Sequence, residues 1–304
     1  MFKKAGKSVT YNDVLRFNYL IGKAIIENQN ILLTEDDYHS LLLFDDEPQR
    51  EGFIATHFKG DYYLDEENAW LDGVVDRLQR MSRYSAETLE YKKAIAYYAL
   101  FQSCLVKRPF NLFHRKNLYL RMNDVTRTFG NKSTWDRSFE ACFGRFVLEA
   151  NKLVFDSGKQ CKSINRSVLD LDEYGFDLVY LDPPYFRREG TNETSNYAKC
   201  YHFLEGIARY PEWPSLLRNK TEVETSNPTE RNIIEFIDAL LEKFRRSTIV
   251  ISYKQGGVPS TEFIYQRLKK LKTKVHRCSK HYKYALNRQN GQAKSNREVL
   301  LIGE

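Results

Sequence analysis

The stretch FDLVYLDPPYFRREG, residues 176–190, decides the fold. The apolar run 176–181 predicts a strand that is buried on both faces. The prolines after Asp182 end this strand, because proline has a fixed φ and no N–H for the ladder. In an open α/β sheet, ligands bind beyond the carboxyl ends of the strands. The stretch therefore predicts a sheet edge that presents a carboxylate, a stiff turn and the ring of Tyr185 to a ligand.

Strands and helices alternate on both sides of this stretch. Residues 8–13 alternate like a short strand that ends at Asn12 and Asp13, and apolar residues recur at helical spacing over 14–28. Towards the C-terminus, 247–253 predicts a second buried strand, 260–271 a helix and 298–303 a last strand. This alternation is typical of an α/β protein with a mostly parallel sheet.

Residues 34–155 have mainly helical periodicity and break the alternation. We therefore expect a catalytic domain made of 1–54 and 150–304, with a helical insertion at 55–149. Within the insertion, residues 107–132 carry seven Lys or Arg side chains and one acid, Asp124. The simplest explanation is a solvated basic face, but the aromatic residues between the cations favour contact with phosphates.

Composition and charge exclude several classes of protein. The net charge of +7 over 304 residues is compatible with a polyanionic partner. The five cysteines are scattered singly and show no spacing typical of zinc ligands, so we expect no metal site and a reducing cytoplasm. No window approaches the roughly 20 apolar residues of a membrane span.

The residues 182–185 suit one kind of ligand, a planar base with an exocyclic amine. One N–H would donate to the Asp182 carboxylate and the other to the Pro183 carbonyl, while the base stacks on Tyr185. Acceptors that are fixed before the reaction are a route to catalysis, because they direct the amine lone pair towards an electrophile. A base in duplex DNA must first leave the stack, at a cost of a few kcal/mol. The alternative is a turn that only terminates the strand.

The sequence DPPY at 182–185 resembles the catalytic motif of S-adenosylmethionine-dependent amino-methyltransferases, in particular the DNA N6-adenine enzymes. Other segments resemble the family in the same order along the chain: YNDVLRFNYLIGKAIIEN (11–28), GFIATHFKGDYYLDEENAWLDGVVDRL (52–78), YHFLEGIARYPEW (201–213) and TIVISYKQGG (248–257). The resemblance implies a Rossmann-like sheet that binds S-adenosylmethionine and double-stranded DNA.

The resemblance also implies roles for individual residues. The target adenine would be held by Asp182, Pro183, Pro184 and Tyr185. The cofactor would be bound by Asn12 and Asp13 at a strand end, and by Ser167, which occupies the place of a family acid in INRSVLDL (164–171). Asp170 or Asp172 could substitute for that acid. Apart from the resemblance, the charge pattern leads us to place target recognition in the basic insertion and in 187–225. Arg108 and Asn111 would contact base edges, and the further DNA-contact candidates are Arg115, Lys116 and Arg121.

One family motif is missing. The family has a Phe-x-Gly-x-Gly cofactor loop before the acidic strand end, but the 15 glycines of this chain form no Gly-x-Gly. We therefore expect the sheet to be incomplete at its N-terminal edge and the chain to be the larger, C-terminal part of a split enzyme. A small partner subunit would supply the first strand, the glycine loop and the first helix. The alternative is a truncated or decayed gene product.

The expected function is methyl transfer to adenine N6 in a specific DNA sequence, in a heterodimer in the bacterial cytoplasm, associated with the nucleoid. One alternative is a DNA-binding specificity subunit that does no chemistry. Another is an RNA or N4-cytosine methyltransferase. The sequence leaves open the recognition site and whether a restriction nuclease accompanies the enzyme.

Overall fold

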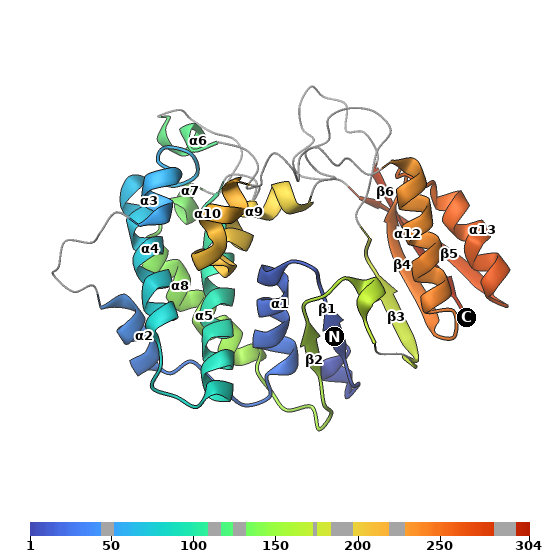
Figure 1. Cartoon of the computed structure of the whole chain (residues 1–304), viewed down its shortest axis with the longest axis horizontal. Coiled ribbons are helices and arrows are strands. Elements are labelled where there is room, and N and C mark those ends of the chain that lie inside the picture. Colours follow the sequence, from blue (N-terminus) through green and yellow to red (C-terminus); the bar gives the residue numbers. More distant parts are fainter. Residues whose placement is uncertain are drawn as a thin grey trace. The chain divides into compact units, whose positions relative to one another are not determined.

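The computed structural model describes residues 1–43, 52–108, 117–123, 132–172, 175–183, 197–218, 229–282 and 296–304 (Figure 1). The chain divides into two compact units. The first comprises 1–166 and 201–218, and the second comprises 167–200 and 219–304. The first strand and helix and the predicted helical insertion thus belong to the same unit. No described helix is both long enough and apolar enough to cross a bilayer.

The sheet of the first unit has two parallel strands, β1 (Thr10–Asn12) and β2 (Lys162–Ile164). β1 confirms the predicted strand at 8–13, whereas β2 was not predicted, because three residues are too few to show an alternating pattern. The helix α1 (Arg16–Gly22) follows β1 and continues as a π-helical turn, η2 (Lys23–Glu27). Gly22 lets this helix approach the sheet, since a Cβ there would come 2.4 Å from the ring of Tyr11.

The rest of the first unit is helical, as predicted for 34–155. Its elements are η1 (Lys3–Ala5), α2 (Glu35–Leu42), α3 (Phe53–His57), α4 (Asp65–Arg80), α5 (Ala86–Val106), α6 (Tyr119–Met122), α7 (Lys132–Trp135) and α8 (Phe139–Leu153). The later elements α9 (Tyr197–Ala208), η5 (Tyr210–Glu212) and α10 (Trp213–Arg218) bring the segment 201–218 into the same core. Trp213 is buried there against Phe53, Phe58 and Phe203, with ring centroids 5.1–5.3 Å apart.

The sheet of the second unit has four strands in the order β3-β4-β6-β5. These are β3 (Leu178–Leu181), β4 (Thr248–Lys254), β5 (Val275–Tyr282) and β6 (Asn296–Gly303), with η4 (Val168–Asp170) before β3. β3 and β4 are parallel, while β6 is antiparallel to both of its neighbours, β4 and β5. The expectation of a mostly parallel sheet is thus wrong for β6. The sequence missed β5, VHRCSKHY, because its polar residues show no alternation.

Helices α12 (Glu230–Lys243) and α13 (Thr261–Leu271) cover one face of this sheet (Figure 1). Their apolar sides pack on alternate strand residues, and the buried cluster includes Ile237, Leu240, Ile264, Leu268, Leu181, Ile249, Ile251 and Leu301. On β3 the other face is open, with Leu178 and Tyr180 exposed by 41% and 53%. The expectation of a strand buried on both faces is therefore wrong for β3 as an edge strand of its unit.

A buried ionic cluster fixes the start of α2. The carboxylate of Asp37 is fully buried and accepts hydrogen bonds from Lys92 Nζ (2.5 Å), Arg83 Nη2 (2.5 Å) and Tyr84 Oη (2.6 Å). Asp37 also accepts a bond from the backbone N–H of Thr34, which closes a capping box. Burial alone would raise the pKa of Asp37, but these bonds outweigh it and lower the pKa below the usual range.

We expect Asp37→Ala to destabilise the protein by about 3–5 kcal/mol, because the mutation leaves the buried Lys92 ammonium without its carboxylate. In the wild type, the stabilisation is present above the unfolded-state pKa of about 4 and is lost as pH falls through the lower folded-state pKa. Urea unfolding of both proteins at pH 7 and at pH 3 would measure this, and the difference should shrink at pH 3. Asp36→Ala, at an exposed position in the same helical turn, should change stability little. Equal effects of the two mutations would contradict the assignment.

Candidate functional site

The carboxyl ends of β3 and β4 lie side by side, because the two strands are parallel with Leu181 opposite Ile251. Asp182 follows β3 directly and is exposed, whereas Pro183 is buried. Ser252, one residue further along β4, is half-buried at the same end of the sheet. The structure thus brings the first two residues of the DPPY motif to the sheet edge where ligands bind in such folds. The other two, Pro184 and Tyr185, lie outside the described residues.

The turn after β4 is tightly built next to this edge. Tyr253 is buried and its hydroxyl donates a 2.7 Å hydrogen bond to the carbonyl of Val258. Gly256 has φ +82°, a conformation that favours glycine, and a Cβ at Gly257 would come 2.6 Å from the Tyr253 ring. Burial raises the pKa of Tyr253. Tyr253 therefore supports the turn from the core. Both glycines of the segment 248–257 are required by the structure of this turn, Gly256 for its backbone conformation and Gly257 for its close contact with Tyr253.

The predicted acid Asp13 lies at the end of β1, in the first unit. Its Oδ1 accepts a 2.8 Å bond from the Leu15 N–H and its Oδ2 a 2.9 Å bond from Asn18 Nδ2. Asn165, which follows β2, donates to the carbonyl oxygens of Asp13 and Val14 at 2.9 Å. Burial raises the pKa of Asp13 in spite of the bonds from Leu15 and Asn18. The geometry is that of an Asx turn at the start of α1, which holds the carboxylate in one orientation.

Asn12, next to Asp13, has an acceptor that is not used. Its Nδ2 donates to the carbonyl of Arg166 at 3.1 Å. Its Oδ1 is buried and has no hydrogen-bond partner among the described residues. A buried amide oxygen without a partner costs free energy unless a donor reaches it. The strand end therefore suits a ligand that carries an amino or hydroxyl group, as S-adenosylmethionine does.

Ser167, the third predicted cofactor residue, belongs to the second unit. It occupies the N-cap position of η4, where its backbone carbonyl accepts a 3.0 Å bond from the N–H of Asp170 and its side chain makes no cap bond. Asp170 and Asp172, the acids that could substitute for it, are both exposed.

Sequence reasoning assigned no role to Glu205, although it lies within the segment 201–213. Its carboxylate accepts a 3.1 Å bond from the N–H of Phe17 and a further bond from the N–H of Arg16. Glu205 thereby caps the first turn of α1, which has no side-chain cap of its own. Burial and the nearby charge of Asp13 raise the pKa of Glu205. A single acid in a helix has no distinctive spacing, so the sequence alone does not single out Glu205. Its place within the family segment YHFLEG was the one indication of a role.

The cations that begin the basic stretch are internal. Arg108 is 1% exposed, its Nη2 donates a 2.8 Å bond to Asn117 Oδ1, and its guanidinium lies 4.2 Å from the ring centroid of Tyr62. Burial lowers the pKa of Arg108. This placement differs from the expected contact with a base edge, because the side chain stabilises the insertion from within.

Arg121 and Lys107 share one carboxylate. Arg121 forms a bidentate pair with Glu67 at 2.7 and 2.8 Å, and Lys107 Nζ lies 2.7 Å from Glu67 Oε1. Burial would raise the pKa of Glu67, but the two cations lower it. The Arg121 side chain is 8% exposed, so its main contact is with the insertion itself. The remaining candidates, Asn111, Arg115 and Lys116, lie outside the described residues, as do 109–116 and 124–131 of the basic stretch.

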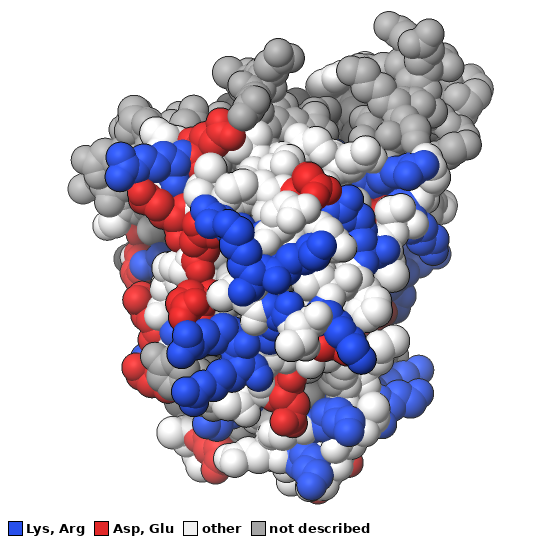
Figure 2. Space-filling model, turned by 90° about the vertical axis from the view of Figure 1, so that its right-hand side faces the viewer, with Lys and Arg blue, Asp and Glu red and all other residues white. Residues whose placement is uncertain are grey.

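A second basic surface lies on the second unit and was missed. Figure 2 shows Lys and Arg side chains gathered on the face that includes α13 and β5. Residues 261–282 carry seven Lys or Arg residues and one acid, Glu262. Arg277 pairs with Glu262 at 2.7 Å, whereas Lys269, Lys270, Lys274 and Lys280 are exposed. Residues 261–282 have the same number of Lys and Arg residues as 107–132, seven, but no family motif lies within them.

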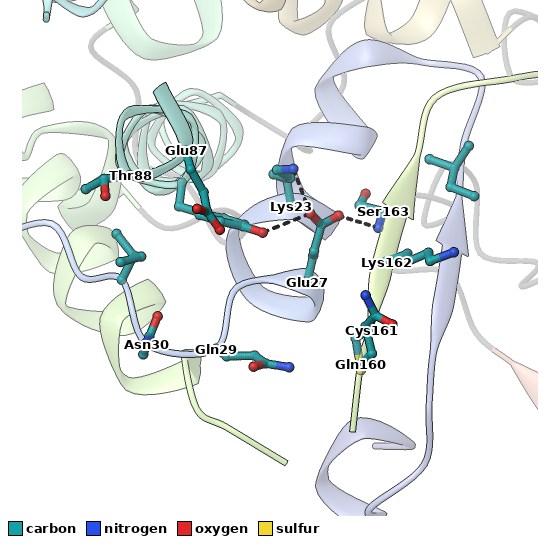
Figure 3. A pocket seen from close by; sticks show the side chains of 13 residues that line it. Lys23, Glu27, Gln29, Asn30, Glu87, Thr88, Gln160, Cys161, Lys162 and Ser163 are labelled. Atoms are coloured by element: carbon teal, nitrogen blue, oxygen red, sulfur yellow. Dashed lines mark hydrogen bonds and ion pairs between the residues drawn. The ribbon is translucent and has the colours of Figure 1, made fainter. Parts of the chain in front are cut away.

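The first unit has a pocket of about 720 Å³ beside the outer edge of β2. It is polar, and none of the predicted site residues lines it (Figure 3). Glu27 projects into it and accepts bonds from Lys23 Nζ (2.6 Å), Tyr91 Oη (2.9 Å) and the backbone N–H of Ser163 (2.7 Å). Glu27 thus satisfies an N–H at the outer edge of β2, which explains the arrangement without a ligand.

Comparison with known proteins agrees with the motifs. The model of the D12 class of N6 adenine-specific DNA methyltransferases matches residues 1–255. The chain is 24% identical to Type II methyltransferase M2.HphI of Haemophilus parahaemolyticus over 99% of this chain and 85% of that protein. It is 27% identical to modification methylase StsI of Streptococcus sanguinis and 27% identical to Type II methyltransferase M.FokI of Planomicrobium okeanokoites.

The last two matches cover 86% and 88% of this chain but only 39% and 40% of those relatives. No solved structure is significantly similar. The family match extends over the strand end at Asn12 and Asp13, the helical insertion, and the edge of β3 and β4 with Asp182. The chain therefore belongs to the D12 class of N6 adenine-specific DNA methyltransferases.

Proposed function

We propose that this chain is the catalytic and DNA-recognition subunit of a site-specific DNA adenine-N6 methyltransferase. The observation that carries the proposal is the exposed carboxylate of Asp182 at the carboxyl end of β3, set by the buried Pro183. A carboxylate in this position is accessible to a base and yet anchored by a strand and a rigid residue. Pro183, Pro184 and Tyr185 complete the adenine-binding motif in this proposal.

The chemistry follows from the hydrogen-bonding capacity of these residues. When bound, S-adenosylmethionine supplies the methyl group. The Asp182 carboxylate accepts one N–H of the adenine amine and the Pro183 carbonyl accepts the other, which keeps the lone pair of the nitrogen available for bond formation. Stacking on Tyr185 offsets part of the cost of taking the base out of the duplex.

The cofactor residues in this proposal are Asn12, Asp13 and Ser167. Support comes from the buried Oδ1 of Asn12, which has no partner among the described residues and suits a donor of the cofactor. The Asp13 carboxylate is already held by Leu15 and Asn18, so it would meet the cofactor in a fixed orientation.

The glycine loop comes, in this proposal, from another polypeptide segment that assembles with the chain as a small partner subunit. Two observations support this. The sequence has no Gly-x-Gly, and among the described residues β1 and β3 each pair with a strand on one side only. An open strand edge is a template for pairing with another strand.

We expect Asp182→Ala to abolish methyl transfer while leaving DNA affinity nearly unchanged, because the mutation removes an acceptor of the amine and no phosphate contact. Incorporation of labelled methyl groups into DNA and a filter-binding assay would measure the two properties in the chain assembled with the glycine-loop segment. Asp177→Ala is the matched control, because Asp177 is an exposed acid that directly precedes the same strand. Methylation at the wild-type rate by Asp182→Ala would remove Asp182 from the mechanism. If the wild-type assembly binds DNA in the filter assay but does not methylate it, the chain is a DNA-binding subunit without catalytic activity.

We expect Arg115→Gln with Lys116→Gln to flatten the salt dependence of DNA binding, by roughly one unit of slope per lost phosphate contact. Titrations at several salt concentrations would measure the slope. Lys269→Gln with Lys270→Gln is the control, because it removes the same charge from the second basic surface. A change of slope in the control alone would move the DNA footprint from the insertion to α13.

A further inference from the structure

β3 has one paired edge and one open edge. Thr248 N–H donates to the Asp177 carbonyl at 2.9 Å, so odd-numbered residues of β3 bond to β4. In a parallel pair the bonded residues alternate, which leaves the backbone groups of Leu178 and Tyr180 on the opposite edge. No described strand pairs there. Apart from its short length, β3 lacks the sequence features that protect an edge, because its four residues, LVYL, include no charge and no proline.

The side chains of Leu178 and Tyr180 lie on a face of the sheet that no described helix covers. The face of the sheet under α12 and α13 is closed, with Ile249, Ile251 and Leu301 exposed by 1% or less. On the opposite face Leu178 and Tyr180 are exposed by 41% and 53%, although they belong to a strand with a parallel neighbour. Parallel strands are normally covered on both faces.

The apolar part of the open face adjoins the open edge. Tyr180 is in register with Val250, Val250 with Ile302 and Ile302 with His276, so these residues form one row across the four strands. The row is apolar on β3, β4 and β6 and becomes polar on β5, where His276 is exposed. An apolar helix would therefore cover the half of the face next to β3 and leave the half at β5 exposed to solvent.

The handedness of crossovers predicts the same position for a helix. β3, α12 and β4 form a parallel crossover, and such crossovers are right-handed in almost all proteins. A strand added to β3 has to lie on the side away from β4. If the helix that follows it connects to a further parallel strand on the side away from β4, a right-handed crossover passes over the face opposite α12. That face is the one on which Leu178 and Tyr180 are exposed.

We propose that a strand–helix unit of another polypeptide segment docks on the second unit. Its strand pairs parallel to β3 through the backbone groups of Leu178 and Tyr180, and its amphipathic helix covers Tyr180, Val250 and Ile302. The inference rests on the proposed function, because it identifies this unit with the segment that carries the glycine turn. The glycine turn, between this strand and helix, then lies at the carboxyl edge of the sheet, beside Asp182.

The test uses the full chain and a purified polypeptide from the coding sequence that flanks the chain's own, with a strand, a Phe-x-Gly-x-Gly turn and a helix. The double variant Leu178→Lys with Tyr180→Lys should fold like the wild type when alone, because both side chains are exposed. It should bind the polypeptide about 100-fold more weakly, because two apolar side chains are lost from the interface. His276→Lys is the control, on the same face at the far edge. Amide hydrogen exchange at Leu178 and Tyr180 should slow when the polypeptide binds the wild type.

The outcomes separate this inference from the proposed function. If the assembled wild type methylates DNA but the double variant binds equally tightly and Leu178 and Tyr180 gain no protection, the docking surface is wrong and the function stands. If Leu178 and Tyr180 gain protection from amide exchange but the assembly transfers no methyl group, the docking surface is confirmed and the proposed function is wrong. Sedimentation of the chain alone tests a second copy as the occupant. If the wild type sediments as a dimer and the double variant as a monomer, a second copy occupies the surface and the inference is overturned.

Discussion

An interior strand of a parallel sheet has a neighbour on each edge and a cover on each face, and β3 has only one of each within the described residues. Everything proposed for the catalytic edge depends on this strand, because Asp182 follows it directly and Pro183 fixes the exit. β4 holds β3 from one side, and α12 packs on its buried face through Leu181. On the other side of β3 the side chains of Leu178 and Tyr180 are exposed, and in the proposed assembly another segment would cover them.

The first unit uses a different principle, the satisfaction of buried polar groups by distant residues. Glu205 lies 188 residues from Phe17 in the sequence and yet caps the first turn of α1. Asp72 similarly accepts the N–H groups of Ile54 and Ala55 and the hydroxyl of Tyr210. These contacts tie the segment 201–218 to the helical insertion and to the helix after β1. The late family motif YHFLEGIARYPEW is therefore an architectural element of the unit that contains Asn12 and Asp13.

The sequence predicted those helices and strands that have a long periodic pattern of apolar residues or a recognisable motif at one end. The helices of 34–155, the strands β1, β3, β4 and β6 and the helix α13 were all expected from periodicity and turn residues. β2 and β5 were missed, because the first is too short and the second too polar for a pattern to show. The direction of β6 could not be predicted, since strand residues do not encode whether a neighbour is parallel or antiparallel. Arg108 and Arg121 show how far the site could be predicted from the sequence. A run of basic residues does not reveal which cations are buried against a carboxylate or an aromatic ring.

Glu27 has a consequence for assembly. By occupying an outward N–H of β2, its carboxylate blocks the outer border of the two-stranded sheet, and Lys23 and Tyr91 keep it in place. Pairing with a further strand is then disfavoured at β2 and favoured at the other edge of the small sheet, where no described strand pairs with β1. Such a border favours a complex of defined stoichiometry over open-ended polymerisation.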